Sequence, residues 1–402
     1  MFPKVRAGLG LGLISTFFFL SSSYAADTDH VRVRLGSAPA ELEFVTESLR
    51  FDEEAFTKRP GQILRVKIEK APAGALRMRV TSGGKAVLER LIGEPPVRFE
   101  TREAKMGPKN LPPHLILDQV AGVIELRAEV AFTDYLLGVL SREMPGMWPM
   151  EALKAQAVAT RSYTLSQMRA RTAWSFDLEG SILDQEFEWV TPKRRASPAL
   201  RRWAEALAGT RDQVLRGAGG EVFRAYYHAD CGGRTTTPEF VWGPVGEYKS
   251  VRDPSCEARP SNKWKFVAEK NWLKKQLQDP GGDRRLPAAT KAGLEFSWIQ
   301  SLFDQRVTLV EWWDGMSDLK ILSGQNFRQL LGFGKLKSLR FHTREQGKDV
   351  VFEGQGYGHG VGLCQWGSKD WAEKGLSSTQ ILNHYYPLAR VGAPPRGYAQ
   401  AR

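Results

Sequence analysis

Hydrophobic and polar residues alternate along four stretches in the first third of the chain. These are Val31–Leu35, Ile63–Ile68, Leu76–Val80 and Val123–Ala128. A period of two is typical of strands that bury one face. We therefore predict a β-rich N-terminal region over residues 26–130, to which the sequence assigns no chemistry.

The spacing of apolar residues becomes helical near residue 133. Leu136, Leu137 and Leu140 share one side of a predicted helix for which Thr133 is placed as the N-cap. A proline at position 145 disfavours helix at the residue before it, so this helix is expected to end near Glu143.

A second helix is predicted from Pro149 to about Arg171, because proline is favoured at the first position of a helix. Four alanines between residues 152 and 159 make this helix slim enough to pack closely against its neighbours. We expect it to be central in the fold.

The rest of the chain mixes both signals. We expect strands at 221–227, 307–313 and 336–342, helix over most of 263–305, and a last helix opened by a capping box of Ser377 and Gln380. The predicted class is α+β, with mixed helices and antiparallel strands forming a substrate groove beside the β-rich flank.

The first 25 residues have the pattern of an export signal. Lys4 and Arg6 precede an apolar run over residues 9–20, which ends before a small-residue cleavage site at 23–25. A retained anchor is the alternative, but the run is shorter than the roughly 20 residues that span a bilayer. We expect an exported protein of the periplasm or cell wall, with no membrane span once the signal is removed.

The charge balance is basic, with 57 Lys and Arg against 45 Asp and Glu. A polyanion or an anionic surface is therefore a plausible partner. Nucleic acid is not expected, because the chain has no groove-reading or base-stacking motif.

The three cysteines are too few for a disulfide scaffold. In an oxidising compartment, Cys231 and Cys256 form the favoured disulfide candidate, which leaves Cys364 unpaired. The alternatives are free thiols or a zinc site built on His228, Cys231 and Cys256, for which no fourth ligand is evident.

Glu143 is the carboxylate best placed for catalysis. It stands where a helix is expected to end, and the negative pole of the helix dipole disfavours a charged carboxylate there. A carboxyl group kept protonated near neutral pH can act as a general acid. In the second helix, Arg161 lies among apolar residues and needs an anion or a carbonyl partner, which a structural ion pair would also supply.

A glycine-rich loop runs from Gly354 to Gly367, with His359 near its centre. Glycines let the main chain approach a ligand closely, so we expect this loop to form the wall of a binding or catalytic groove. Its glycine spacing matches neither a P-loop nor a dinucleotide fingerprint.

Three blocks in order resemble the stage II sporulation protein D family, which includes the amidase-enhancer domain of wall-lytic proteins. They are Ser141 to Tyr163, which contains Ser-Arg-Glu-Met-Pro, Tyr227 to Thr235, which contains Tyr-His-Ala-Asp-Cys-Gly-Gly, and Gly356 to Gly367, which contains Gly-His-Gly-Val-Gly-Leu-Cys-Gln. The resemblance covers roughly residues 120–390 and implies a catalytic domain over 131–392.

The resemblance implies a lytic transglycosylase that cleaves peptidoglycan glycan strands, preferably strands without stem peptides, and leaves 1,6-anhydro-muramyl ends. It places the catalytic acid on Glu143 and substrate contacts on Arg161, Lys249, His359 and Gln365. No cofactor is required by this chemistry, although a structural zinc remains open.

Two other functions remain open. One is a non-catalytic module that binds the wall and enhances a partner amidase. The other is a zinc hydrolase built on His228, Cys231 and Cys256.

Overall fold

The computed structural model describes residues 30–38, 40–51, 54–57, 62–72, 75–92, 96–278, 295–302, 304–313 and 319–395. The predicted export signal, residues 1–25, lies outside the described residues, as does part of the stretch 263–305. Among the described helices, none is long and apolar enough to cross a membrane.

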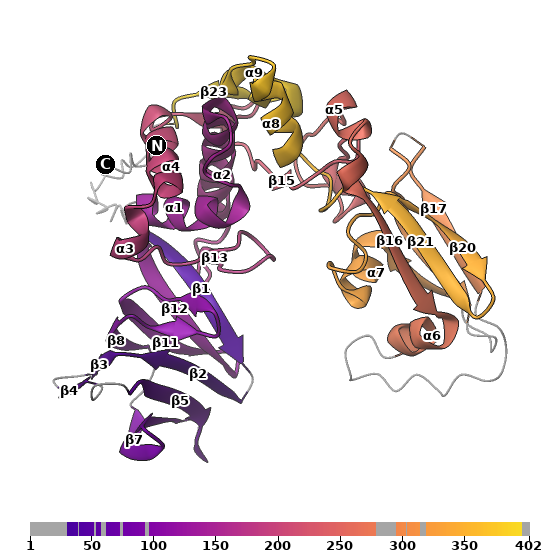
Figure 1. Cartoon of the computed structure of the whole chain (residues 1–402). Coiled ribbons are helices and arrows are strands. Elements are labelled where there is room, and N and C mark those ends of the chain that lie inside the picture. Colours follow the sequence, from indigo (N-terminus) through magenta and orange to yellow (C-terminus); the bar gives the residue numbers. More distant parts are fainter. Residues whose placement is uncertain are drawn as a thin grey trace, which may run out of the picture.

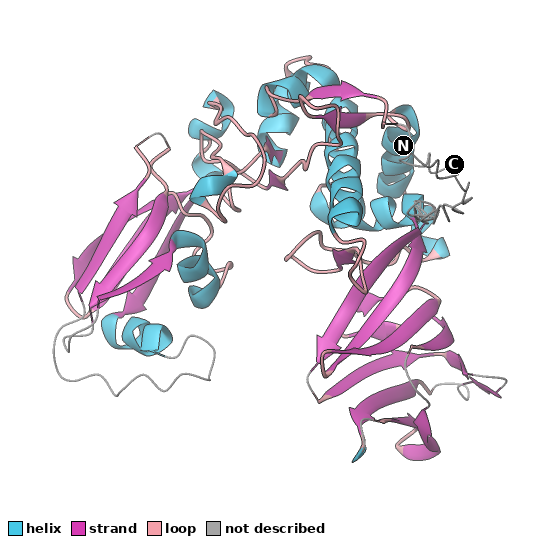
Figure 2. Ribbon diagram, turned by 180° about the vertical axis from the view of Figure 1, so that it is seen from behind, coloured by secondary structure: helices cyan, strands magenta, loops and turns pink. Residues whose placement is uncertain are grey.

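A layer of helices joins two strand-rich parts of the molecule (Figure 1). The N-terminal strands lie below one end of this layer, and the sheet that contains β16, β20 and β21 extends from the other end. The view from behind shows the same arrangement, with helices gathered between the two sets of strands (Figure 2). The fold is mixed α+β, as the sequence predicts.

Twelve strands make up the N-terminal part of the described chain. They are β1 (His30–Ala38), β2 (Glu41–Thr46), β3 (Ser48–Phe51), β4 (Glu54–Thr57), β5 (Leu64–Lys70), β6 (Leu76–Ser82), β7 (Lys85–Ile92), β8 (Val97–Arg102), β9 (Lys105–Met106), β10 (Lys109–Asn110), β11 (His114–Val120) and β12 (Val123–Ala131).

These strands form two sheets within the described residues. One has the order β13-β1-β12-β11-β8-β3-β4 and the other the order β10-β9-β2-β5-β6-β7. The short strand β13 (Leu178–Glu179) pairs parallel to β1, so a segment beyond α2 completes the first sheet. The alternation in the sequence is reproduced in the burial: Val31 and Val33 are fully buried on β1, as are Val66 and Ile68 on β5.

The remaining elements follow in chain order. The helices are α1 (Phe132–Glu143), α2 (Met150–Ala170), α3 (Pro192–Arg195), α4 (Pro198–Gly209), α5 (Pro254–Glu257), α6 (Lys270–Gln278), α7 (Gly324–Leu331), α8 (Gln365–Glu373) and α9 (Ser378–Tyr385), with 3-10 turns at Pro238–Phe240 and Pro260–Asn262. The strands are β14 (Val214–Arg216), β15 (Tyr227–His228), β16 (Lys263–Glu269), β17 (Glu295–Gln300), β18 (Val307–Trp313), β19 (Leu319–Ser323), β20 (Phe341–Gln346), β21 (Asp349–Gln355), β22 (Leu363–Cys364) and β23 (Arg390–Gly392).

One hydrophobic core is continuous from the N-terminal strands into the helices α1, α2 and α4. Residues of β1, β5 and β12 share this core with Tyr135, Leu153 and Trp203. The packing therefore has no boundary at residue 131, where the sequence suggests one.

Helix α2 packs against two cores at once. Its residues Ala152 and Ala157 belong to the core shared with the N-terminal strands, whereas Ala155 and Ala159 belong to a second core with α9 and the three cysteines. All four alanines are fully buried. The small side chains let the helix be surrounded, which is the central position that the sequence predicts.

Four local expectations are wrong. The strand expected at 336–342 is β20 (Phe341–Gln346), which begins five residues later than predicted. Helix α1 begins at Phe132, and its N-cap is Ala131 without a side-chain bond, so Thr133 is not the cap. The stretch 221–227 contributes only Tyr227 to a two-residue strand. The first part of 263–305 is the strand β16, because its alternate residues pair with β21, and only Lys270–Gln278 is helical there.

Enlarging a buried alanine of α2 tests this packing. We expect Ala157→Leu to lower the free energy of unfolding by about 1–3 kcal/mol, since a well-packed core cannot accept the added volume without displacing neighbours. Ala170→Leu, the same change at an exposed position of the same helix, is the control. Equal urea midpoints for both variants would contradict the tight packing.

Candidate active site

Glu143 is the last residue of α1. The next residue, Met144, is extended with φ −141° and ψ 150°, and its N–H donates to the carbonyl of Leu140. Pro145 follows, and Pro149 is the N-cap of α2, so the chain between the two helices is short and restricted in conformation. The carboxyl group of Glu143 is thereby held at a fixed helix end.

Two side chains from distant segments contact this carboxyl group. The amide Nε2 of Gln365 donates to Oε2 of Glu143 at 3.0 Å, and the hydroxyl of Tyr227 also hydrogen-bonds to it. Burial raises the pKa of Glu143 to about 7, and the negative charge of Glu186 acts in the same direction, while the hydrogen bonds from Gln365 and Tyr227 oppose the rise.

The raised pKa has the direction predicted from the sequence, but its main cause differs. Loss of hydration has the largest effect on Glu143, rather than the helix dipole. A carboxyl group with a pKa of about 7 is protonated in roughly half of the molecules at neutral pH. It can therefore both give and accept a proton there.

A short parallel ladder brings Tyr227 and Gln365 to the same place. In this ladder, β15 pairs with β22 so that Tyr227 lies opposite Leu363 and His228 opposite Cys364. Gln365 follows directly as the first residue of α8. The ladder therefore fixes two hydrogen-bond donors at Glu143.

Buried polar side chains hold Tyr227 in turn. Gln185 donates from Nε2 to the Tyr227 hydroxyl at 2.9 Å, and its Oε1 accepts from Tyr135 at 3.1 Å and from Thr164 at 3.0 Å. Burial raises the pKa of Tyr227 well above its usual value, so its hydroxyl remains a donor. Sequence reasoning did not select Tyr227 or Gln185, because their function depends on contacts between segments.

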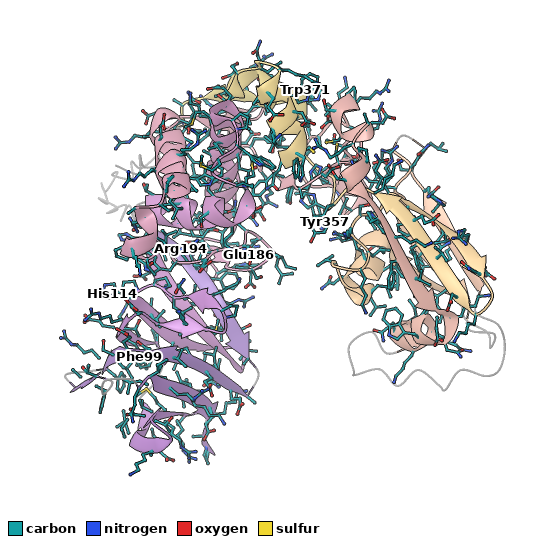
Figure 3. All side chains as sticks on the ribbon, viewed as in Figure 1. Phe99, His114, Glu186, Arg194, Tyr357 and Trp371 are labelled. Carbon is teal, nitrogen blue, oxygen red and sulfur yellow. The ribbon has the colours of Figure 1, made fainter. Side chains whose placement is uncertain are left out.

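Glu186 is a second carboxylate near Glu143 that sequence reasoning missed. It lies on the loop after β13 (Figure 3). Arg142 contacts it at 3.1 Å and Lys109 at 3.7 Å. No local pattern in the sequence marks Glu186, because its importance comes from its closeness to Glu143 in space.

The glycine loop closes onto the protein itself. Gly356, Gly358, Gly360 and Gly362 all have positive φ angles, which side chains disfavour. A Cβ atom at Gly362 would lie 2.0 Å from the carbonyl of Tyr226, and one at Gly360 would meet the buried Arg306. The close approaches expected for a ligand are thus explained by packing against the segments that carry the site.

His359 lies within a group of aromatic rings. Its ring centroid is 4.8 Å from that of Trp242, 5.5 Å from that of His228 and 6.1 Å from that of Tyr226. Burial, together with the neighbouring His228, holds the pKa of His359 well below its usual value. The ring is therefore neutral at neutral pH.

Lys249 and Arg161 are not among the partners that the structure describes for Glu143. Lys249 is exposed on the loop between Trp242 and α5. Arg161 is buried, and its guanidinium donates to the carbonyls of Thr210 at 2.8 Å and Gln213 at 3.0 Å, beyond the C-terminal end of α4. Arg161 has the carbonyl partners that a buried arginine requires, which explains a structural role, and the expected substrate contact stays a prediction.

The three cysteines are all buried and free, so the predicted disulfide between Cys231 and Cys256 is not formed. Cys364 joins them, with its Sγ 3.4 Å from that of Cys256. His228 contacts Cys231 and its Nδ1 lies 3.1 Å from the carbonyl oxygen of Val361, but it is outside the group of described ligand atoms that all lie within 4.8 Å of one another. Oδ2 of Asp253 also lies 3.5 Å from Sγ of Cys231, so Cys364 and Asp253 both join a group that the sequence did not reveal.

Comparison with known proteins identifies sequences similar to this chain. A sequence model described as stage II sporulation protein matches residues 121–216. The chain is 29% identical to stage II sporulation protein D of Bacillus amyloliquefaciens over 268 residues, which cover 64% of this chain and 73% of that protein.

Two further relatives match over similar lengths of this chain. An uncharacterized protein of Brachyspira hyodysenteriae is 29% identical over 260 residues, covering 64% of this chain and 66% of that protein. The amidase enhancer of Bacillus subtilis is 25% identical over 293 residues, covering 63% of this chain and 39% of that protein.

Residues 121–216 are thus similar to the stage II sporulation protein family, and the longer alignments extend the similarity to proteins that bear this name. The matched family segment contains Glu143 and Arg161, but it ends before Tyr227 and the glycine loop. The hydrogen bonds that surround Glu143 thus join the family segment to residues outside it.

Replacing Arg161 separates its two possible roles. We expect Arg161→Met to lower the free energy of unfolding by about 1.5–3 kcal/mol, because carbonyls beyond α4 lose charged donors. Arg201→Met, an identical change at an exposed position of α4, is the control. Unchanged urea unfolding combined with weaker glycan binding would restore the substrate role to Arg161.

The pKa of Glu143 makes stability depend on pH. The folded-state value, about 7, lies above the ordinary value of 4.5, so the native state binds more protons between these limits and its stability falls as pH rises through them. We expect Glu143→Gln to gain stability relative to the parent chain over this window, by roughly 3 kcal/mol at most. Urea unfolding from pH 4 to 8 measures the difference, and a constant difference would contradict the raised pKa.

Proposed function

We propose that the protein is an exported lytic transglycosylase that cleaves the glycan strands of peptidoglycan, with Glu143 as the single catalytic residue. The observation that carries this proposal is the desolvated carboxyl group of Glu143, with a pKa of about 7, between Tyr227 and Gln365. A group that serves first as acid and then as base works best when its pKa is near the operating pH.

The chemistry needs one carboxyl group and no added water. Protonated Glu143 gives its proton to the bridging oxygen while the bond from that oxygen to C1 of the muramic acid breaks. The carboxylate then accepts the proton of the C6 hydroxyl, whose oxygen bonds to C1. This closes the 1,6-anhydro ring and returns the proton to Glu143.

A hydrolase would need a second carboxylate to position water or to form a covalent intermediate. Asp230 and Asp253 are unsuited to this role because both are buried. Asp230 accepts hydrogen bonds from Gly232 and Asn262. Asp253 accepts them from Cys256 and Tyr385. Glu186 is the remaining candidate near Glu143, but it is engaged by Arg142 and Lys109. The transglycosylase mechanism is therefore favoured.

Exposed aromatic side chains close to Gln365 and His359 support a carbohydrate ligand. Trp366 is 37% exposed and follows Gln365, Tyr357 is 47% exposed within the glycine loop, and Trp242 is 42% exposed and packs against His359 of that loop. Aromatic faces pack against the apolar faces of sugar rings. We assign these three rings, together with Lys249, His359 and Gln365, to glycan binding.

The names of the relatives support a function at the cell wall. Two proteins that the chain resembles are called stage II sporulation protein D and amidase enhancer. An exported location fits that function, and the excess of basic residues fits an anionic wall.

A non-catalytic enhancer of a wall amidase is the second candidate, and the resemblance to the amidase enhancer favours it. In this case, the same exposed rings would bind glycan, and Glu143 would be inactive. A zinc hydrolase on His228, Cys231 and Cys256 is not favoured, because all three residues are buried and substrate has no access to a metal there.

Product analysis distinguishes these functions. The purified chain is incubated with intact peptidoglycan and with peptidoglycan whose stem peptides an amidase has removed, and soluble products are identified by mass spectrometry. We expect anhydro-ended fragments, mostly from the stripped strands, and a loss of at least about 10²-fold in their rate of release for Glu143→Gln.

Glu186→Gln is the matched control, since it neutralises the neighbouring carboxylate. We expect it to keep forming anhydro ends. Reducing ends that disappear in Glu186→Gln would instead identify a hydrolase with two carboxylates. Binding to the strands without any soluble product would favour the enhancer function.

A further inference from the structure

Four potential metal ligands meet beside the candidate active site. Cys231 follows β15, Asp253 and Cys256 stand at the start of α5, and Cys364 ends β22. One ligand atom from each residue lies within 4.8 Å of the other three, and all four residues are buried. Segments up to 133 residues apart, the separation of Cys231 and Cys364, thus converge on one point.

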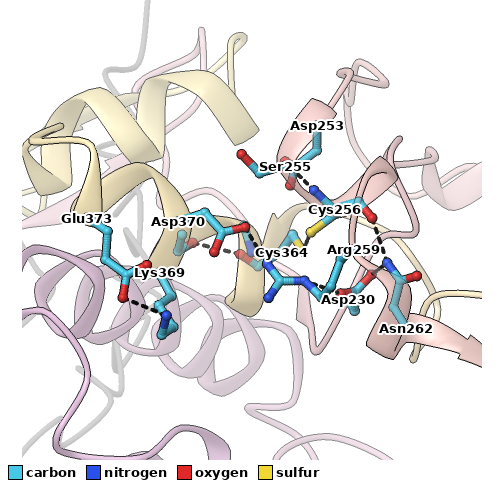
Figure 4. A network of polar contacts seen from close by, with 12 residues as sticks. Asp230, Asp253, Ser255, Cys256, Arg259, Asn262, Cys364, Lys369, Asp370 and Glu373 are labelled. Carbon is cyan, nitrogen blue, oxygen red and sulfur yellow. Dashed lines mark hydrogen bonds and ion pairs between the residues drawn. The ribbon is translucent and has the colours of Figure 1, made fainter.

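The spacing of these atoms fits a single tetrahedral ion. The Sγ atoms of Cys256 and Cys364 are 3.4 Å apart, and Sγ of Cys231 is 3.5 Å from Oδ2 of Asp253. A zinc–sulfur distance of about 2.3 Å implies sulfur–sulfur separations of roughly 3.8 Å in a tetrahedral site. Figure 4 shows Cys256, Cys364 and Asp253 side by side in the polar network.

Backbone donors are already directed at the sulfur atoms. The N–H groups of Cys231 and Gly367 lie 3.3 Å from Sγ of Cys364, and the N–H of Gly233 lies 3.4 Å from Sγ of Cys231. The hydroxyl of Tyr385 donates to Oδ2 of Asp253 at 2.7 Å. Such outer hydrogen bonds stabilise thiolate and carboxylate ligands and fix their orientation.

A buried positive charge lies next to this cluster. Arg306 is 1% exposed, and its Nη2 donates to the carbonyl of Cys231 at 2.7 Å. Asp304 is its ion-pair partner at 3.6 Å, and the Nε and Nη1 atoms have no hydrogen-bond partner within the described residues. Three thiolates and one carboxylate around a divalent ion carry a net charge of −2, which a neighbouring buried guanidinium would stabilise.

A disulfide explains the cluster less well. Cys256 and Cys364 are close enough for a small movement to join them, but that bond would leave Cys231 as a buried thiol next to Asp253. An ion uses all three sulfur atoms and the carboxylate together. Zinc is the divalent ion whose structural sites combine thiolates with a nitrogen or oxygen ligand in four-coordinate geometry.

We propose that Cys231, Cys256, Cys364 and Asp253 form a structural zinc site. Such a site would clamp two segments that reach Glu143, because Cys231 lies four residues after Tyr227 and Cys364 directly precedes Gln365. With four protein ligands, the ion has no open position for substrate. Zinc would therefore position the donors at Glu143 without entering the reaction.

Metal analysis and thiol counting on the purified full chain test the site. We expect about one zinc per chain, and three reactive thiols after unfolding in chelator without reductant. One thiol without metal would overturn the proposal in favour of a disulfide, and three thiols without metal would overturn it in favour of free cysteines. Another ion at the same stoichiometry would overturn the assignment to zinc.

Two carboxylate variants provide a matched comparison. Asp253→Asn removes a proposed ligand, whereas Asp230→Asn changes an equally buried carboxylate outside the ligand group. We expect at least a tenfold loss of zinc affinity for Asp253→Asn only. An equal loss in both variants would contradict the proposed ligand set.

Cobalt substitution tests the ligands without any variant. Co²⁺ exchanged into the native chain should give thiolate-to-cobalt charge-transfer absorption and the strong visible bands of tetrahedral cobalt. Absence of both would overturn the proposal. These readouts hold whether or not Glu143 cleaves glycan, so the zinc site and the proposed function can fail independently.

Discussion

The hydrogen bond from Gln365 to Glu143 is the contact on which the candidate site depends. It joins residues 222 positions apart and brings the start of α8 to the end of α1. It can form only because α1 stops at Glu143 and because β22 pairs with β15. The end of α1, the glycine loop and the β15–β22 ladder therefore all help to place Gln365 next to Glu143.

Withdrawing a carboxyl group from water is unfavourable, and the packing of the surrounding hydrophobic cores offsets this free energy. Helix α2 runs between two hydrophobic cores and supplies Thr164 to the polar side chains that hold Tyr227. Gln185 connects Tyr227 to Tyr135 on α1. The rigid surroundings keep Glu143 desolvated, and desolvation raises its pKa more than any single charge does.

Local features of the sequence predicted local structure well. The proline at 145 placed the end of α1, the capping box of Ser377 and Gln380 opened α9, and alternation identified β1 and β5. Local features predict a helix after residue 263, whereas the structure has the strand β16 there. The strand forms through pairing with β21, a long-range contact that local features do not show. In this stretch, burial and strand pairing in the tertiary structure outweigh the local conformational preference of the residues.

The candidate site was predictable only in part for the same reason. Glu143 stood out through its place at a helix end, and resemblance suggested Gln365. Tyr227 opens a block that carries the resemblance, but nothing local assigns it a role, and Gln185 and Glu186 have no distinctive local signal, since all three matter through their positions near Glu143 in space. Arg161 was correctly expected to need a partner, but only the structure shows that carbonyls beyond α4 supply it.

Direct titration of Glu143 tests the central claim most closely. Carbon-13 NMR of the side-chain carboxyl groups, with the Glu143→Gln variant used to assign the resonance, follows this one group in the folded chain. The account predicts a midpoint near pH 7. A midpoint near the ordinary value of 4.5 would mean that the carboxyl group is hydrated and ionised at neutral pH, and it would contradict its role as the acid.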